Sequence, residues 1–323
     1  MVKIRIHRKR EKRGERKGIL LSALLFFVLF PYIIGSFSKE EKQTYSAIDI
    51  PGQIYVMEKK IWGGQIIPLE EYLTGMVAAT IPAEYEEETL KAQAVILRSF
   101  CVKHLKKEDG RKVIYDEELK EYYFTKQECE KMWGEQAKKY LQKIQEAVND
   151  TRGMILVCND DIVEAPFCRM SNGKTRDITE YVISKENYEY MKTVTCSGDC
   201  LAADFIQYRE IQQKEFEKII SKLIESKTDN IEKIVLYRDN NDYVKEVQIG
   251  EEKVEGEKFR EILDLPSSCY SLDKIDKNIE IQTRGQGHGF GFVQYEANEL
   301  AVKGKDYMYL LDYFFNNLSF EKL

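Results

Sequence analysis

The sequence of 323 residues lacks the local patterns of the common nucleotide-binding sites. Its densest glycine run, Gly285–Gly291, is not followed by Gly-Lys-Ser or Gly-Lys-Thr, and its spacing does not fit the dinucleotide fingerprint. Internal repeats and low-complexity segments are absent as well. Histidine is scarce, and His288 is the only one in the C-terminal two-thirds. The glycine run around His288 therefore needs an explanation other than phosphate binding.

Positive charge is scarce outside the first 17 residues. Those residues carry nine Lys or Arg against two Glu, so a net charge of −6 for the whole chain leaves −13 on the remainder. An acidic surface of this kind does not suit nucleic acid. We therefore expect no nucleic-acid partner, whereas a neutral or cationic target is compatible with the charge.

Charged residues are absent from the mostly apolar segment 18–35. About 18 residues lie at the short end of what crosses a hydrocarbon core. The basic residues before it favour a cytoplasmic N-terminus. A cleaved signal peptide is the alternative, but the run is longer than a signal-peptide core. We expect a cytoplasmic tail (1–17), a transmembrane helix (18–35), a linker (36–49) and an extracytoplasmic domain (50–323) in a single-pass protein of the cell membrane.

The seven cysteines are an odd number and cannot all pair with one another. Cys196 and Cys200 are close in the sequence, and they fit either a small disulfide loop or, with Cys168, part of a metal site. Tetrahedral zinc sites usually draw four ligands from two such knuckles, and this chain offers one. We expect no metal and no cofactor, and Cys168, Cys196 and Cys200 stay weak candidates for a metal-stabilised adaptor.

The spacing of apolar residues predicts a mixture of helices and strands. Pro68 and the acids after it favour a helix start, and Pro82 ends that helix. The charged segment 105–130 indicates a loop-rich insertion. We expect helices over 68–81, 86–101, 131–149, 213–226, 257–263, 295–303 and 307–315, and strands over 153–158, 162–167, 235–237, 244–249 and 279–283. This order is typical of the α+β class.

The glycine run is the strongest functional signal in the chain. Four glycines alternate around His288, and Gln294 and Tyr295 follow. Glycines at this density allow positive φ angles and a close approach of the backbone to a ligand. An amide and a phenol suit a hydroxyl-rich substrate. We interpret the run as a binding or catalytic loop, with a tight turn of no function as the alternative.

Three ordered groups of motifs resemble the SpoIID/LytB family. They are Pro68–Leu73 with Pro82-Ala83, Leu90–Val95 and Arg98; Trp133–Gly153 with Ser171–Thr175; and Gly287–Gly291 with Gln294-Tyr295, Ala301, Gly304 and Tyr307. Together they span nearly all of residues 51–317. The resemblance implies a sporulation protein that acts on peptidoglycan, an α+β domain with two lobes around a cleft, and a SpoIIP-like amidase and a SpoIIM-like membrane protein as partners.

The resemblance also implies a lytic transglycosylase whose catalytic glutamate precedes the proline of the Pro-Ala pair by two residues. Thr80 occupies that position here. One carboxyl must protonate the leaving oxygen and then take the proton of the sugar's 6-hydroxyl, which a threonine cannot do. Enzyme activity is therefore open. Either the protein binds glycan without cutting it, or Glu84, with Glu71 behind it, substitutes as the acid, or the reaction differs.

We expect the substrate to contact side chains from all three groups of motifs. Arg98 has a salt bridge inside the fold as its alternative role, and the Ser171 turn needs no function. Our hypothesis is a membrane-anchored protein that acts on or binds glycan strands during sporulation; a scaffold that recruits or enhances a peptidoglycan hydrolase is the alternative. The candidate substrate-binding residues are Gln93, Arg98, Ser171, His288, Gln294 and Tyr295.

Overall fold

The computed structural model describes residues 54–57, 66–108, 111–115, 123–182, 188–224 and 234–323. Among these residues, no helix has both the length and the apolar character needed to cross a membrane. The predicted tail, transmembrane helix and linker (1–49) lie outside the described residues.

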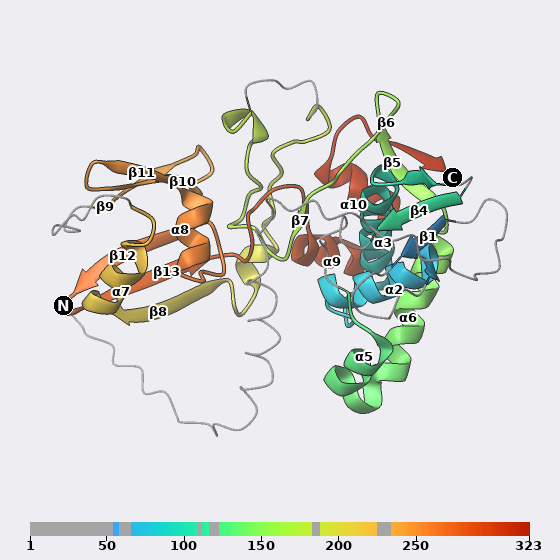
Figure 1. Ribbon diagram of the computed structural model, residues 1–323, viewed down its shortest axis with the longest axis horizontal. Coiled ribbons are helices and arrows are strands. Elements are labelled where there is room, and N and C mark those ends of the chain that lie inside the picture. The colour runs from blue at the N-terminus through green and yellow to red at the C-terminus, as the bar shows by residue number, and fades with distance from the viewer. Residues whose placement is uncertain (1–53, 58–65, 109–110, 116–122, 183–187, 225–233) are drawn as a thin grey trace.

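The described elements form two lobes, which are separate in Figure 1. The first, here called the helical lobe, combines helices with two small sheets of order β2-β1-β4-β3 and β15-β5-β6. Strand β1 runs parallel to β4, and the other pairs are antiparallel. Its elements are β1 (Ile54–Met57), β2 (Ile66–Pro68), α2 (Leu69–Thr80), α3 (Glu87–Lys103), β3 (Lys106–Glu108), β4 (Arg111–Tyr115), α5 (Lys126–Trp133), η1 (Gly134–Gln136), α6 (Ala137–Asp150), β5 (Met154–Cys158), β6 (Asp161–Ile162), α9 (Gln294–Val302), α10 (Tyr307–Phe314) and β15 (Ser319–Lys322).

The second lobe, here called the sheet lobe, is inserted in the chain between the two halves of the helical lobe. It has two antiparallel sheets of order β11-β10-β9 and β12-β13-β8, and its own buried core. Its elements are β8 (Ile206–Gln212), α7 (Gln213–Ile220), β9 (Ile234–Arg238), β10 (Val244–Ile249), β11 (Glu252–Glu255), α8 (Gly256–Ile262), β12 (Tyr270–Ile275) and β13 (Asn278–Arg284).

The segments between the lobes contain little regular structure. Two short strands, β7 (Phe167–Cys168) and β14 (Phe292–Val293), pair in parallel there, and two 3-10 turns, η2 (Ile178–Glu180) and η3 (Asp199–Leu201), lie nearby in the sequence. The mixed class and the two lobes agree with the prediction. The cleft between the lobes stays a prediction.

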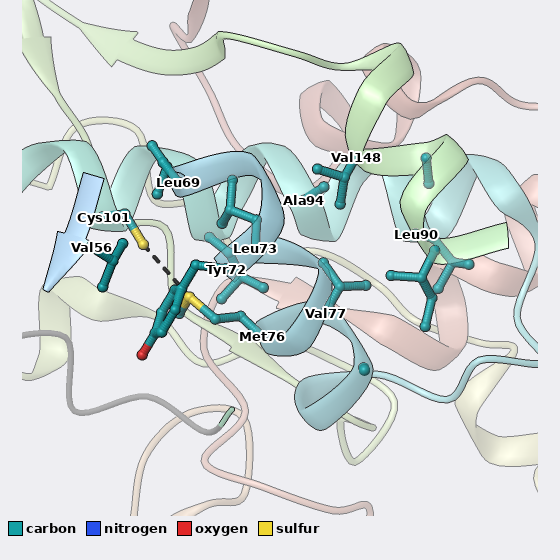
Figure 2. Close-up of a cluster of buried hydrophobic side chains, with 14 of the residues drawn as sticks. Val56, Leu69, Tyr72, Leu73, Met76, Val77, Leu90, Ala94, Cys101 and Val148 are labelled. Carbon is teal, nitrogen blue, oxygen red and sulfur yellow. Dashed lines mark hydrogen bonds between the residues drawn. The ribbon is translucent and has the colours of Figure 1, made fainter. Parts of the chain in front are cut away.

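Helix α2 ends where the sequence predicted. Ile81 precedes Pro82 and takes an extended conformation (φ −141°, ψ 146°), because the proline ring disfavours helical geometry in the residue before it. Thr80 is therefore the last helical residue. The apolar face of α2 is fully buried against α3. Figure 2 shows Leu73, Met76 and Val77 of α2 together with Leu90 and Ala94 of α3.

Helix α3 is the central element of the helical lobe. It packs against α2, α6, α9, α10 and β5. Near its C-terminal end the Cys101 sulfur lies 3.6 Å from the Met76 sulfur (Figure 2). At its other end, the Glu86 backbone N–H donates to Asn298 Oδ1 on α9 at 2.7 Å. The turn between α2 and α3 is therefore fixed against α9.

Two expectations about the middle of the helical lobe were wrong. The predicted helix 131–149 is two helices, because Gly134 takes a positive φ of 53° and separates α5 from α6. The charged segment 105–130 is not loop-rich throughout, since it contains the antiparallel pair β3–β4 and most of α5. A capping box of Thr125 and Glu128 starts α5.

Arg176 joins the glycine run to the sheet lobe. Its buried guanidinium donates to Glu257 Oε1 on α8 at 2.6 Å, to Asp239 Oδ2 at 3.3 Å and to the carbonyl of His288 at 3.1 Å. The Tyr181 hydroxyl completes the cluster through bonds to both Arg176 and Asp239. Charge-assisted bonds of this kind are strong, so the position of the glycine run is tied to the sheet lobe.

Candidate functional site

Thr80 is buried, and its hydroxyl faces its own helix. The relative exposure of the residue is 1%, and Oγ1 donates to the Met76 carbonyl at 2.8 Å. The hydroxyl therefore satisfies its hydrogen bond inside α2. A threonine in this setting has no proton to give at neutral pH, so position 80 cannot supply an acid.

Two buried glutamines connect Thr80 to the end of the glycine run. Gln294, the first residue of α9, donates from Nε2 to the Thr80 carbonyl at 2.8 Å and lies 3.2 Å from Gln93 Oε1 on α3. The Nε2 group of Gln93 has no hydrogen-bond partner although it is buried. The predicted residues Gln93 and Gln294 are thus brought to Thr80, and one amide donor is left for another group.

The glycine run lies directly against residues 166–171. Gln286 and Met170 exchange backbone hydrogen bonds of 2.8 and 3.0 Å, and Phe292 N–H donates to the Pro166 carbonyl. A Cβ on Gly291 would lie 2.1 Å from that carbonyl oxygen, and Gly291 takes a φ of 72°. The glycines therefore permit a close approach to the protein's own backbone. The sequence had predicted a close approach to a ligand instead.

His288 is a neutral, internally bonded histidine. Its Nδ1 accepts a hydrogen bond from the Phe290 N–H at 3.0 Å, and burial lowers its pKa to about 4 although the charge of Glu257 acts to raise it. Neutral imidazole has one acceptor nitrogen, which this bond uses. His288 therefore orients the glycine run, and the acceptor that general-base catalysis needs is occupied.

Arg98 lies inside the helical lobe, away from the predicted substrate. Its Nε and Nη2 donate to the two carboxylate oxygens of Glu70 at 2.9 and 2.7 Å, and the side chain has no exposed surface. The remaining donors reach the carbonyls of Val148 and Met154 and the hydroxyl of Thr151. Of the two roles that the sequence left open, the salt bridge inside the fold is the one the structure shows.

Ser171 holds a buried carboxyl. Its backbone N–H and its hydroxyl both donate to Asp199 Oδ2, at 2.7 and 2.6 Å. The next acid, Glu296 on α9, accepts from the Gly198 N–H at 2.6 Å. Oδ1 of Asp199 has no partner. Asp199 and Glu296 were missed in the sequence, where the segment from Cys196 to Cys200 was considered for its thiols alone.

Asp199 is a carboxyl that titrates near neutrality. Burial raises its pKa from 3.8 to about 7, against the hydrogen bonds of Ser171 that lower it, and the charge of Glu296 adds to the rise. The folded state therefore favours the neutral form of Asp199.

The effect of Asp199→Asn on the free energy of unfolding is expected to change sign with pH. Because the folded pKa of Asp199 lies above its unfolded value, wild-type stability falls as pH rises from about 4 to about 7. The shift corresponds to about 4 kcal/mol, and a buried amide with one unpaired atom costs about 1–3 kcal/mol. The variant should thus be less stable than wild type at pH 4 and more stable at pH 8, by about 2 kcal/mol each way. Urea unfolding at both pH values measures this, with exposed Asp204→Asn as the control; parallel pH curves for wild type and Asp199→Asn would contradict it.

A second polar cluster lies beside Thr80 and was not predicted. The buried hydroxyl of Tyr85, in the turn between α2 and α3, has no hydrogen-bond partner, and neither has the buried Nε of Arg169. The Tyr295 N–H donates to the Arg169 carbonyl at 2.9 Å, so the cluster adjoins the first turn of α9. Of the predicted residues, Tyr295 alone belongs to it. Neither Arg169 nor Tyr85 is part of the motifs named above.

Comparison with known proteins shows the family of the chain. A family model described as SpoIID, stage II sporulation protein, matches residues 58–158. Stage II sporulation protein D of Bacillus amyloliquefaciens is 30% identical over 257 residues, covering 78% of this chain and 74% of the relative. The chain belongs to the SpoIID family. The protein of the same name from Bacillus subtilis (strain 168) is 31% identical over 254 residues, covering 77% of this chain and 73% of the relative.

This SpoIID chain has no sheltered carboxyl in the turn after Thr80. Glu84 is exposed, and the Lys143 ammonium lies 3.3 Å from the carbonyls of both Ala83 and Glu84, so this side of the turn adjoins α6. Glu71 is exposed on α2. General acids at neutral pH usually owe a raised pKa to burial. Glu84 and Glu71 are exposed, so neither has the burial that would support it as a substitute acid.

The cysteines of this SpoIID chain are free thiols. Cys168 and Cys196 are buried and Cys200 is exposed, and none of the seven cysteines is in a disulfide. Burial raises the pKa of Cys168 to about 12, which disfavours the thiolate that binds metals. In the described part of the chain, no three His, Cys, Asp or Glu side chains are arranged to hold a metal ion. The adaptor alternative therefore lacks a set of ligands.

Proposed function

We propose that this SpoIID protein binds the glycan strands of peptidoglycan during sporulation and does not cleave them. The observation that carries the proposal is Thr80. The family resemblance implies a glutamate at this position, and here a buried hydroxyl donates to the Met76 carbonyl. The step that needs a proton donor has none at the expected place.

Polar groups around Thr80 support the binding part of the proposal. Buried polar atoms are normally paired, and unpaired ones indicate a missing partner. Here the amide of Gln93, the hydroxyl of Tyr85 and the Nε of Arg169 are all buried without one. Hydroxyls and acetamido groups of amino sugars offer both donors and acceptors to such atoms.

Nearby carboxyls do not supply the missing acid. Asp199 accepts two hydrogen bonds from Ser171 and Glu296 accepts one from the Gly198 N–H, so both carboxyls are held by the fold itself. Asp204 is exposed and accepts from Gln286 Nε2 at 2.6 Å. Glu84 is exposed as well. These positions favour a binding protein over an enzyme with a substitute acid.

The proposed location rests on the sequence, and the proposed partners rest on the family resemblance. We propose that residues 18–35 anchor the chain in the membrane, with residues 50–323 on the outer side. A SpoIIP-like amidase and a SpoIIM-like membrane protein are the proposed partners, as the family resemblance implies. The glycan-bound protein would recruit or enhance such a hydrolase.

The test uses the full-length chain in detergent and glycan strands whose peptides have been removed. We expect the protein to sediment with these strands, not with cellulose, and mass spectrometry to find no new 1,6-anhydro ends. New ends that disappear in Glu84→Gln would instead show an enzyme with a substitute acid. A protein that does not sediment with the strands would overturn the proposed function.

A further inference from the structure

We propose that the sheet lobe has an anion site between Arg238 and Arg284, which binds a singly charged oxyanion: the carboxylate or the phosphodiester group of a small ligand. The site lies outside the polar cluster around Thr80 and needs no glycan. A cavity, an excess of positive charge on its wall and a set of unused donors support it.

The cavity has a volume of about 200 Å³ and lies where β13 meets the glycine run. One water molecule needs about 10–15 Å³ of such volume, so the cavity has room for a small anion. Strands of both sheets of the lobe contribute to it, because Arg238 ends β9 and Arg284 ends β13. The lining residues are Arg238, Cys269, Tyr270, Ser271, Gln282 and Arg284.

The wall of the cavity has more positive than negative charge. Asp242 accepts a hydrogen bond from Arg284 Nη2, and its other carboxylate oxygen lies 3.5 Å from Arg238 Nε. Among the residues that the structure describes, no other carboxylate forms an ion pair with either arginine. Two cations therefore share one anion, and one positive charge is left over.

Cys269 does not supply the missing negative charge. Burial raises the pKa of this thiol, although the charges of Arg284 and Arg238 act to lower it. The sulfur is therefore an uncharged thiol at neutral pH, and it contributes a neutral wall to the cavity.

The fold holds Arg238 through neutral acceptors. Its Nη1 donates to the Asp242 carbonyl at 2.8 Å and its Nη2 to the Tyr270 carbonyl at 2.7 Å. Carbonyl oxygens fix the position of a guanidinium without cancelling its charge. Arg238 is thus positioned before any ligand arrives, which lowers the entropic cost of binding.

The other lining residues keep donors for a ligand. A guanidinium has five N–H donors, and those of Arg284 are used in part by Asp242 and by the neighbouring sulfur of Cys269. Gln282 donates from Nε2 to the Tyr208 hydroxyl at 2.9 Å, and the same amide nitrogen has a second N–H. The hydroxyl of Ser271 adds a neutral donor.

A row of carboxylates beside the cavity limits the charge of the ligand. Asp273, Glu280 and Glu210 lie directly opposite one another on β12, β13 and β8. Because side chains alternate along a strand, Asp273 shares a sheet face with Ser271, and Glu280 shares it with Gln282. The row would repel a polyanion that extended along the sheet. A compact group with one charge avoids this repulsion.

The single unbalanced charge narrows the chemistry further. Arginine binds carboxylates and phosphates through two parallel N–H···O bonds. A phosphate monoester has between one and a half and two negative charges at neutral pH, which exceeds the positive charge left over. Carboxylates and phosphodiesters have one each. They are two sources of the same chemistry, and the ligands of the experiment separate them.

The experiment measures the binding of small ligands to the full-length chain in detergent by calorimetry. The probes are N-acetylalanine, dimethyl phosphate, the neutral amide of N-acetylalanine, and pyrophosphate. Wild type should bind the first two more tightly than the last two. Arg284→Gln should weaken the binding of both monoanions about 10-fold to 100-fold. Exposed Arg152→Gln removes the same charge in the helical lobe and should bind like wild type.

Asp242→Asn should have the opposite effect. It removes the carboxylate that competes with the ligand for both arginines, so the binding of the monoanions should strengthen about 2-fold to 5-fold. Asp242 has a φ of 71°, which asparagine adopts readily, so the turn should keep its conformation. If the three residues served only as a surface ion-pair network, this variant would not gain affinity.

The preferred monoanion assigns the site to a carboxylate or to a phosphodiester, and either result supports the proposal. Wild type that binds the neutral amide as tightly as N-acetylalanine would overturn it, and so would tighter binding of pyrophosphate. Unchanged binding in Arg284→Gln, or no gain in Asp242→Asn, would show an ion-pair network without a ligand. Each of these results would leave the proposed glycan binding intact, because the polar cluster around Thr80 contains none of these residues.

Discussion

Thr80→Glu is expected to turn the protein into an enzyme that cleaves glycan strands. Wild type should form no new 1,6-anhydro ends on peptide-free glycan, and the variant should form them at a measurable rate. A general acid in place usually contributes about 10²–10⁴-fold. This is the largest effect on activity that we expect from a single substitution in the chain.

The environment of position 80 suits a glutamic acid. Thr80 is the last residue of α2 and is 1% exposed, and a carboxyl there would meet both burial and the negative end of the helix dipole. Both raise the pKa of a carboxyl and favour its protonated form near neutrality. The amides of Gln93 and Gln294 adjoin the position and can orient the acid.

The control for this prediction is Thr80→Gln, which matches glutamate in size and has no proton to transfer. Both variants lose the bond from Thr80 Oγ1 to the Met76 carbonyl, so both should lose a similar amount of stability, about 1 kcal/mol. Mass spectrometry of the released fragments compares them at equal folded concentration. If both variants bind strands and neither cuts them, the residues around position 80 do not form a transglycosylase site.

The sequence predicted elements well where local chemistry decides them. Pro82 fixed the end of α2, and apolar spacing located α3, α9 and α10. It failed between residues 105 and 150. The hairpin β3–β4 is held by the pairing of β4 with β1, and the charged residues of the short edge strand β3 carry no apolar alternation for a sequence to show.

The candidate site shows the same division. The resemblance placed Thr80, Gln93 and Gln294 in one site, and the structure brings them together although the Thr80–Gln294 bond spans 214 positions. The glycine run was expected to approach a ligand, because the sequence does not tell which backbone lies opposite. Arg169 was not predicted at all. Arg169 stands out because its buried Nε has no hydrogen-bond partner. That absence is visible only when the neighbours of Arg169 in the fold are known.

The second large effect concerns stability. Arg98→Met is expected to destabilise the fold by about 3–5 kcal/mol, because it leaves the Glu70 carboxylate without its buried ion pair. The lost hydrogen bonds also connect α3 to α6 and β5, through Val148 and Met154. Denaturant unfolding followed by circular dichroism measures the change.

Two further variants separate a structural role for Arg98 from contact with substrate. Glu70→Gln combined with Arg98→Met removes both charges and should recover part of the lost stability, since no uncompensated ion is then buried. Arg169→Met should cost less than about 1 kcal/mol, because Nε of Arg169 has no partner to lose. We expect the folded fraction of Arg98→Met to bind glycan like wild type. An Arg98→Met protein of unchanged stability that no longer binds glycan would place Arg98 at the substrate and contradict its role inside the helical lobe.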